Sequence, residues 1–243
     1  MKKNRTVLIT GATSDIGSEI ISLYANAGWN IIGHYCSSSG KINKVKDLIR
    51  RAGVSGCFLK ADFTLESQLL KFIQKAKEFQ INALINNAGS YVTKKHFSVL
   101  TIRDIREAFM VNTFAPMLLS SQLFEQMKKN KFGRIVNISS IAAKYGGSAH
   151  SMHYGCSKLA LEGATKTLAR EGAGYGILVN TIRPGVIDTD FHKKFPKNMR
   201  KRLLLIPLKK MGKPKDVAEM VFYLGSEKNK YITNETVAIS GGE

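Results

Sequence analysis

A chain of 243 residues with 44% hydrophobic and 23% charged residues has the composition of a folded globular protein, which excludes a disordered or collagen-like one. It has no run of roughly 20 apolar residues that would cross a membrane, and its apolar run at positions 7–9 is too short for a signal peptide, so we expect a cytoplasmic protein without a membrane partner. The 37 Lys and Arg residues exceed the 18 Asp and Glu residues, and the formal net charge of +19 favours acidic substrates or partners.

Two kinds of segment alternate along the chain. Seven short apolar runs bounded by turn residues are predicted to be strands: 6–10, 30–34, 56–60, 83–86, 134–139, 177–183 and 236–240. Longer segments between them, such as 16–27 and 65–79, carry apolar residues at helical spacing. The alternation predicts an α/β fold with a doubly wound, mostly parallel, seven-stranded sheet and helices on both faces, as in Rossmann-like proteins. Ligands of such a sheet bind at the carboxyl ends of its strands.

The first predicted strand is followed by a turn of small residues that opens a helix. This turn contains Gly11, Thr13 and Ser14, and Asp15 and Ile16 follow it. Small residues let the backbone approach a pyrophosphate, which the N–H groups of a helix N-terminus attract. The simpler alternative is an ordinary turn in which Ser14 or Asp15 caps the helix.

The second predicted strand ends without an acidic residue. An NAD-specific site needs Asp or Glu at this point, whereas Tyr35, Ser37 and Ser38 are followed by Lys41 and Lys44. Hydroxyl groups and a nearby lysine suit a 2′-phosphate, so NADP(H) is favoured over NAD(H). The alternative is a plain loop without selectivity.

Polar residues also follow later strands. Asp62 and Phe63 come after the third strand, and residues 86–89, which include Asn87, Ala88 and Gly89, come after the fourth. Both segments belong to the expected ligand edge of the sheet, although an Asn-Asn-Ala-Gly run is also an ordinary turn sequence.

A tyrosine and a lysine four residues apart follow the fifth strand, which ends in Ser139 and Ser140. Tyr154 and Lys158 lie on one face of a predicted helix, where the ammonium group favours the phenolate and lowers the phenol pKa toward a value useful for proton transfer. A second such pair, Tyr91 and Lys95, has no preceding serine-bearing strand, and we interpret it as a chance match.

Two further features concern the cysteines and the basic residues. Cys36, Cys57 and Cys156 show no Cys-x-x-Cys spacing and no histidine partners, so we expect neither a disulfide nor a metal site. Residues 189–215 contain ten basic residues and one acid, Asp190. This basic segment is either a solvated surface or an attractant for anions. We expect one domain, 1–243, with a small helical lid at about 189–213 before the last helix and strand.

Together these segments resemble the short-chain dehydrogenase/reductase family over essentially the whole chain. The motifs that carry the resemblance occur in the family's order at near-family spacing: 10–17, Asp62, 86–89, Ser140, Tyr154 with Lys158, 183–185, 232–233 and 240–242. The resemblance is greatest to the 3-oxoacyl-acyl carrier protein reductases of fatty acid biosynthesis. It implies an NADP(H)-dependent reduction of a ketone.

The resemblance also implies residue roles. Tyr154 is the acid/base, Ser140 binds the substrate carbonyl oxygen, and Lys158 holds the nicotinamide ribose and lowers the tyrosine pKa. Asn112 matches the asparagine that anchors a proton-relay water. The resemblance and the strand-end residues described above together predict the cofactor contacts. These are Gly11, Thr13, Ser14, Asp15, Ile16, Tyr35, Ser37, Ser38, Asp62, Phe63, Asn87, Ala88, Gly89, Tyr154, Lys158, Pro184, Gly185, Ile187 and Thr189.

Three departures from the family pattern stand out. Asp15 replaces the usual second glycine, so we expect its carboxylate to face outward or to cap the helix. Ser14 stands where NADP-binding members often carry a basic residue. The interval from Ser140 to Tyr154 is one residue longer than usual, which predicts a bulge at 142–153 near the substrate.

The leading substrate is a 3-oxoacyl thioester carried on an acidic acyl carrier protein. Lys131 matches a basic docking position of such reductases, and Tyr175 replaces the other. One alternative is a dehydrogenase of an anionic or nucleotide-linked sugar or cyclitol, and another is a non-catalytic dinucleotide sensor. The sequence contains no helix-turn-helix, zinc finger or RNA-binding aromatic motif, so we expect no nucleic-acid partner. The family implies a homotetramer built on the segment 102–127 and the Tyr154 helix.

Overall fold

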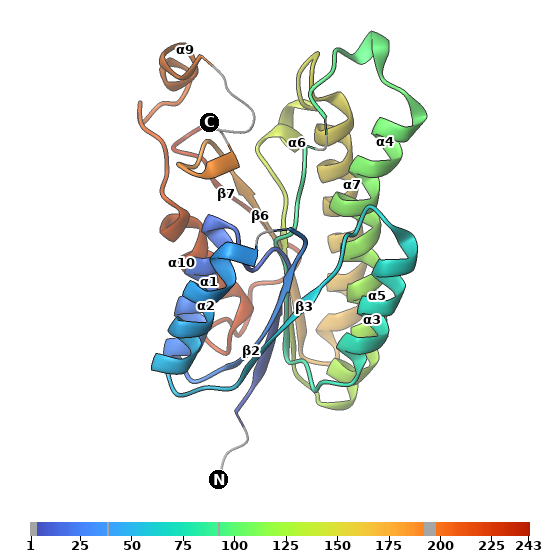
Figure 1. Ribbon diagram of the computed structural model, residues 1–243, viewed down its shortest axis with the longest axis vertical. Helices are drawn as coiled ribbons and strands as arrows, with labels where there is room; N and C mark the ends of the chain where they lie inside the picture. The colour runs from blue at the N-terminus through green and yellow to red at the C-terminus, as the bar shows by residue number, and fades with distance from the viewer. Residues whose placement is uncertain (1–3, 38, 92, 192–197) are drawn as a thin grey trace.

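A seven-stranded sheet with only parallel neighbours forms the centre of the computed structural model, which describes residues 4–37, 39–91, 93–191 and 198–243 (Figure 1). The strands are β1 (Thr6–Ile9), β2 (Asn30–Tyr35), β3 (Gly56–Lys60), β4 (Ala83–Asn86), β5 (Gly133–Ile138), β6 (Ile177–Pro184) and β7 (Thr236–Ile239). Their order across the sheet is β3-β2-β1-β4-β5-β6-β7. The predicted fold class is confirmed, and every strand boundary lies within one residue of the predicted one.

Helices cover both faces of this sheet. On one face, α1 (Asp15–Asn26), α2 (Ser39–Arg51) and α10 (Pro214–Gly225) share a buried apolar cluster with the strands. On the other face, α3 (Glu66–Lys77), α5 (Ala115–Lys129) and α7 (Met152–Ala173) share a second cluster. Successive strand residues alternate between the clusters, with Val7 and Ile9 in the first and Leu8 in the second. This two-sided burial explains why the strand sequences are continuously apolar.

The strand order reverses between β1 and β4. The chain proceeds from β1 to one edge of the sheet through β2 and β3, and from β4 to the other edge through β5, β6 and β7. The loops after β1 and β4 therefore diverge and leave a crevice at the carboxyl ends of the strands. At its base the loop after β1 is joined to β4, where the Thr10 N–H donates to the Ile85 carbonyl at 3.0 Å.

The segment 102–127 after β4 is not one continuous α-helix. It consists of α4 (Ile102–Phe109), a π-helical turn at Met110–Phe114 and α5. Thr101 caps α4 through a reciprocal capping box with Asp104. A π-turn inserts one extra residue into a helix and often marks a functional position. Here it contains Asn112.

Short elements complete the end of the molecule toward which the strands run, which is the upper end in Figure 1. These elements are η1 (Phe97–Val99), α6 (Ala142–Tyr145) and α9 (Met199–Leu204). Helix α9 lies within the segment predicted to be a lid, and residues 192–197 of that segment are outside the described residues. No helix among the described residues is both long and apolar enough to cross a membrane.

Candidate active site

A cavity of about 1090 Å³ lies at the carboxyl ends of the strands, and nearly all the predicted site residues line it. Ser140, Tyr154 and Lys158 line it together with the predicted cofactor-contacting residues Gly11, Thr13, Ser14, Asp15, Ile16, Tyr35, Ser37, Asp62, Phe63, Asn87, Ala88, Gly89, Pro184, Gly185, Ile187 and Thr189. Two predicted residues are exceptions. Asn112 does not line the cavity, and Ser38 is outside the described residues. Within the described part of the chain, no group of His, Cys, Asp and Glu is arranged to hold a metal ion.

The turn between β1 and α1 can approach a ligand because two glycines keep it compact. Gly11 has φ +65°, and a Cβ atom there would lie 3.0 Å from the Asn87 amide nitrogen. At Gly17, a Cβ atom would lie 2.3 Å from the Gly11 carbonyl oxygen, so only glycine lets α1 pack against the turn. Ser14 caps α1 by accepting a hydrogen bond from the Gly17 N–H at 3.0 Å.

Residues 86–89 are locked to this turn and do not form an isolated one. The Asn87 amide group donates to the carbonyl oxygens of Thr10 and Gly11 at 2.9 and 3.0 Å. The Ala88 N–H donates to the Thr10 hydroxyl at 2.9 Å. The two strand-end motifs therefore form one rigid wall of the cavity.

His34 fixes the same turn from the β2 side, a role that the sequence analysis missed. Its Nδ1 accepts from the Gly11 N–H at 3.2 Å, so Nε2 carries the proton and donates to the Ala61 carbonyl at 3.0 Å. The ring stacks on Phe63 with centroids 3.9 Å apart. Burial is the main cause that lowers the His34 pKa to about 4, so the ring is neutral near pH 7. An apolar strand that ends in histidine is too weak a signal to predict this role.

Tyr154 and Lys158 lie close to the substrate side of the cavity, but their pKa values differ from the sequence expectation. Desolvation by the surrounding protein raises the Tyr154 pKa to about 12, and a hydrogen bond with Ser140 offsets part of this rise. Burial lowers the Lys158 pKa to about 8. Lys158 Nζ donates to the Ile138 carbonyl at 2.7 Å. The Tyr154 pKa is therefore raised overall, because burial of the phenol dominates, and the lowering effect of Lys158 stays a prediction.

Tyr91, which we interpreted as part of a chance match, lies against the predicted catalytic tyrosine. Its ring stacks on Tyr154 with centroids 4.8 Å apart and an angle of 16° between the planes. The ring centroids of Phe191 and Tyr91 are 5.8 Å apart, so the two residues form an aromatic wall beside Tyr154. Lys95, the other half of that pair, instead binds both Asp104 oxygens at 2.9 Å.

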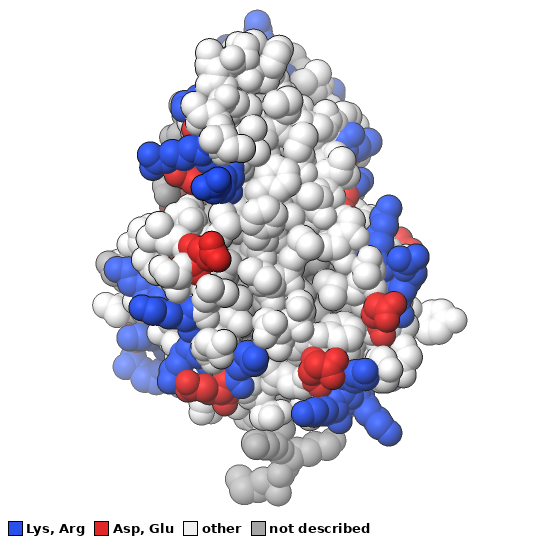
Figure 2. Space-filling model, turned by 90° about the vertical axis from the view of Figure 1, so that its right-hand side faces the viewer, with Lys and Arg blue, Asp and Glu red and all other residues white. Residues whose placement is uncertain are grey.

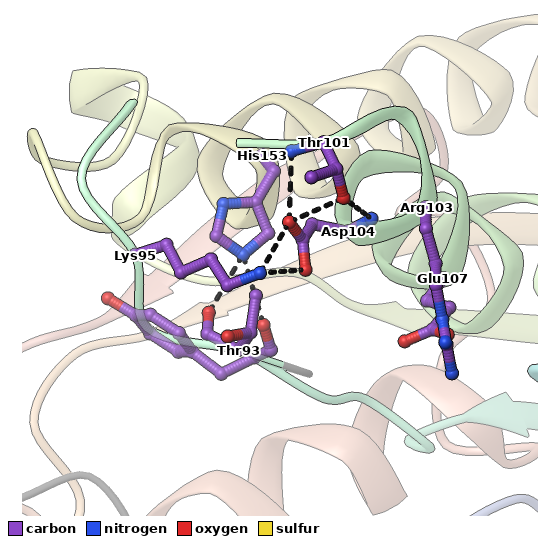
Figure 3. A network of polar contacts seen from close by, with 8 residues as sticks. Thr93, Lys95, Thr101, Arg103, Asp104, Glu107 and His153 are labelled. Carbon is purple, nitrogen blue, oxygen red and sulfur yellow. Dashed lines mark hydrogen bonds and ion pairs between the residues drawn. The ribbon is translucent and has the colours of Figure 1, made fainter. Parts of the chain in front are cut away.

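The loop that carries Tyr91 is held by His153, the residue before Tyr154. His153 Nε2 lies 3.2 Å from the Tyr91 carbonyl oxygen and 2.9 Å from that of Thr93. Carbonyls only accept, so Nε2 is the protonated nitrogen. Figure 3 shows His153 pointing at this loop and, beside it, Lys95 reaching Asp104. The position of the aromatic wall thus depends on contacts from α7 and from the start of α4.

Asn112 lies behind the cavity wall. It is fully buried; its side chain accepts from the Ser90 N–H at 3.0 Å and donates to the Ser90 carbonyl and to the Ser157 hydroxyl. These contacts brace the loop after β4 against α7. The side chain therefore acts as a positioning group that does not face the substrate, and the water-anchoring role remains a prediction.

The segment predicted to bulge forms α6 and a tight turn beside the cavity. Gly146 and Gly147 have φ values of +70° and +91°. A Cβ atom at Gly147 would lie 2.4 Å from the Ser151 carbonyl oxygen, so the turn folds closely onto the start of α7. Tyr145, Ser148 and Ser151 line the cavity from this segment, and none of them was predicted as a site residue.

The stretch after β6 forms the opposite wall. The Gly185 N–H donates to the Ile239 carbonyl at 2.9 Å, and a Cβ atom at Gly185 would lie 2.8 Å from Ser240 Cα. The chain end that follows β7 therefore packs directly behind residues 184–187.

Comparison with known proteins agrees with this geometry. A family model described as enoyl-(acyl carrier protein) reductase matches residues 11–243. The chain is 33% identical to the 3-oxoacyl-(acyl-carrier-protein) reductase FabG of Pseudomonas aeruginosa over 245 residues, which cover 99% of this chain and 97% of that protein. The chain belongs to the short-chain dehydrogenase/reductase family. Like the relatives that it matches, this short-chain dehydrogenase/reductase is an oxidoreductase.

Two solved structures extend the comparison. A 3-oxoacyl-(acyl-carrier-protein) reductase from Agrobacterium tumefaciens with NADP bound superimposes with a TM-score of 0.89 at 26% identity, covering 99% of this chain and 95% of that chain. A structure described as an NAD(P)-dependent gluconate 5-dehydrogenase from Beutenbergia cavernae, with bound NADP at low occupancy, has a TM-score of 0.90 at 28% identity. It covers 99% of this chain and 97% of that chain.

The residues of this short-chain dehydrogenase/reductase fit a nicotinamide dinucleotide. At Gly11 and Gly17 a Cβ atom would fill the space that lets the backbone approach a ligand closely. The N-terminus of α1 faces the same cavity. Tyr35, Ser37, Asp62 and Phe63 surround one end of the cavity. Residues 184–189 line the end where Ser140 and Tyr154 lie.

Asp15 neither caps α1 nor faces outward, contrary to the expectation for its replacement of the family glycine. Its carboxylate accepts from the Asp190 N–H at 2.7 Å and pairs with Lys41 Nζ at 3.0 Å. Lys41 also pairs with the Asp190 carboxylate at 2.6 Å. Lys41 offsets part of the negative charge of the two carboxylates, and the three residues join α1, α2 and the segment after β6.

Proposed function

We propose that this short-chain dehydrogenase/reductase uses NADP(H) to reduce a ketone to a secondary alcohol, with a 3-oxoacyl thioester as the leading substrate. The observation that carries the proposal is that Ser140, Tyr154 and Lys158 line one cavity together with the glycine turn of α1. When bound, the reduced dinucleotide supplies the hydride. The protein's residues bind the ketone, orient it and provide the proton.

In this mechanism the side chains stabilise and then protonate the substrate oxygen. The Ser140 hydroxyl donates a hydrogen bond to the carbonyl oxygen, on which negative charge develops. Tyr154, with a pKa of about 12, is protonated at neutral pH and donates its proton to that oxygen. Lys158, with a pKa of about 8, is mostly charged at pH 7, so it binds ribose hydroxyls and stabilises the phenolate that remains.

The preference for NADP(H) is supported by the end of β2. Ser37 and Lys41 line the cavity there, and neither Tyr35 nor Cys36 supplies a carboxylate for the ribose hydroxyls. Lys41 is held at the cavity wall by Asp15 and Asp190, and its ammonium group keeps one of its three N–H donors for a 2′-phosphate.

An acidic acyl carrier protein is the proposed partner. Lys131 lines a second cavity, of about 540 Å³, with Lys128, Lys129 and Tyr175. Lys128 Nζ lies 4.3 Å from the Tyr175 ring centroid, so Lys128 supplies a cation beside the tyrosine that replaces the family's basic residue. This basic cavity precedes β5 and β6 and is therefore at the opposite end of the sheet from Tyr154.

A second candidate function is the oxidation of an anionic sugar or cyclitol. The basic residues of 198–215 and the similarity to a structure described as a gluconate dehydrogenase favour it. A non-catalytic dinucleotide sensor is the candidate of another class.

The test is a kinetic comparison with purified protein, monitored by the absorbance of the reduced nicotinamide. NADPH and NADH are each offered with a short 3-oxoacyl thioester, free and carrier-bound, and with a panel of keto sugar acids. We expect NADPH to be consumed faster than NADH with the thioester, and the carrier-bound form to have the lower KM. Turnover of keto sugar acids alone would favour the second function, and NADPH binding without any turnover would favour the sensor.

A further inference from the structure

Arg202 of α9 and Glu243 near the end of β7 form an ion pair in the wall of the catalytic cavity. Both side chains line that cavity, and their exposed fractions are only 17% and 11%. Arg202 Nη2 donates to Glu243 Oε1. Arg202 Nη1 and Glu243 Oε2 are buried, and among the described residues neither atom has a hydrogen-bond partner.

This pairing uses Nη2 of the guanidinium group and, as far as the structure describes the chain, leaves Nη1 without a hydrogen-bond partner. Arginine and carboxylate groups commonly pair through two parallel hydrogen bonds, and buried polar atoms are normally satisfied. In the described part of the chain the other cations that line the cavity are engaged: Lys41 pairs with Asp15 and Asp190, and Lys158 donates to Ile138. Among these cavity-lining cations of the described residues, Arg202 is the one with a buried nitrogen, Nη1, that has no hydrogen-bond partner.

The pair is fixed at the end of the cavity where substrate reduction would occur. The Ser240 hydroxyl donates to the Glu243 carbonyl at 3.1 Å, and Ser240 packs against Gly185, whose neighbour Pro184 accepts from the Ile141 N–H next to Ser140 at 2.8 Å. The Leu208 N–H donates to the Gly241 carbonyl at 3.1 Å, which anchors the chain after α9 to the same turn. Lys41, by contrast, lies at the α2 end of the cavity.

We propose that Arg202 binds an oxyanion of the substrate, a carboxylate or a phosphate, and that Glu243 holds the guanidinium in position for it. The inference rests on the proposed reduction of a ketone in this cavity and adds a negatively charged group to the substrate. Two sources supply such a group: the carboxylate of a small keto acid or keto sugar acid, and the phosphate on the arm of a phosphopantetheine thioester. Arg202 is a substrate-binding residue in this account and takes no part in proton transfer.

The test compares matched substrates with and without the oxyanion. One pair is the acetoacetyl thioester of phosphopantetheine and that of N-acetylcysteamine, which lacks the phosphate, and the other is a keto sugar acid and a neutral keto sugar. We expect Arg202→Gln to lower kcat/KM about 10- to 100-fold for the anionic member of one pair, mainly through KM, because a hydrogen bond to a charged group is lost. The neutral member should change less than about threefold, and the responsive pair identifies the source.

Two variants serve as controls. Lys201→Gln removes the same charge from the same helix, but Lys201 is exposed and does not line the cavity, so it should not discriminate between the members of a pair. Glu243→Gln keeps an acceptor for Arg202 and removes a negative charge, so KM for the anionic member should fall. Equal losses on anionic and neutral substrates in Arg202→Gln, or the same discrimination in Lys201→Gln, would overturn the proposal.

The two proposals fail in different ways. If the wild-type protein reduces none of these ketones, the proposed function fails. Arg202 is then tested by the thermal stability of the NADPH-saturated protein with inorganic phosphate and with gluconate. A rise in melting temperature that occurs in wild type and Lys201→Gln but not in Arg202→Gln supports the oxyanion site, and identical responses in all three refute it.

Discussion

At the residue scale, desolvation moves the pKa values of Tyr154 and Lys158 in opposite directions. Burial favours the neutral form of each group. The phenol of Tyr154 therefore keeps its proton up to about pH 12, and the ammonium of Lys158 loses its proton above about pH 8. A protonated phenol suits the donor in a ketone reduction, and a charged lysine suits the binding of ribose hydroxyls. We therefore expect the proposed reduction to be fastest where both conditions hold, which is below about pH 8.

This difference predicts the pH dependence of cofactor use. Lys158 is charged below its pKa and neutral above it, so kcat/KM for NADPH should decrease as the pH rises through about 8. Lys158→Met should have a lower kcat/KM throughout and should lack this decrease. The measurement is the initial rate at limiting NADPH from pH 6.5 to 9.5. A decrease near pH 8 that persists in Lys158→Met would assign the ionisation to another group.

Sequence reasoning predicted that Ser140, Tyr154 and Lys158 lie together, as they do in the cavity, because their order and their position after a strand point to one edge of the sheet. It could not identify Tyr91 or Arg202. Tyr91 reaches Tyr154 because its loop is held by His153, and Arg202 reaches the cavity because the chain that follows its helix is anchored to the turn after β7. Such contacts depend on how loops fold back, which residue spacing does not record.

At the element scale, His34 connects three strand ends. It accepts from Gly11 after β1, donates to Ala61 after β3 and belongs to β2 itself. These contacts hold the glycine turn at the N-terminus of α1 in the shape that the dinucleotide needs. The neutral ring is required, because protonated Nδ1 cannot accept from the Gly11 N–H.

The His34 contacts predict acid sensitivity. Its pKa is about 4 in the folded protein and 6.5 in the unfolded chain, so the unfolded chain binds more protons between these values and stability falls as the pH decreases from 6.5 to 4. The expected loss of unfolding free energy is about 3 kcal/mol. His34→Gln should lose about 3 kcal/mol less over this range than wild type, as measured by urea unfolding. His150→Gln, at an exposed histidine, is the control and should behave as wild type.

The regular elements were predictable and the irregular ones were not. Burial on both faces makes strands such as β1 and β4 continuously apolar. The ends predicted from this pattern therefore lie within one residue of the observed ends. The π-turn at Met110–Phe114 has no such pattern. It depends on contacts that Asn112 makes with Ser90 and Ser157, which are distant in sequence.

At the scale of the whole molecule, charge is unevenly distributed over one face. The middle of the face shown in Figure 2, on the side where α4 and α5 lie in Figure 1, has few charged side chains, and Lys, Arg, Asp and Glu gather along its margins. Exposed apolar residues occur on α5 and α7, including Met117, Leu118 and Leu159. An apolar surface of this kind suits a contact between copies of the chain, which supports the expected homotetramer.

The homotetramer is tested by mass in solution. Wild type should elute with the mass of four chains in size-exclusion chromatography with light scattering. Leu118→Glu and Leu159→Glu place charge on the apolar face and should yield smaller species, while Leu204→Glu, at an exposed leucine of α9, should keep the wild-type mass. A monomeric wild type, or an unchanged mass in both α5 and α7 variants, would show that this face is not the contact.

The central claim of a tyrosine-dependent reductase is tested most directly by Tyr154→Phe, which removes the proton donor and keeps the ring stacked on Tyr91. Two quantities are measured on the same preparation: the turnover of the best ketone substrate and the dissociation constant of NADPH. We predict that turnover falls about 10²- to 10⁴-fold while the dissociation constant changes less than about threefold. Turnover equal to that of wild type would contradict the assignment of Tyr154 as the acid.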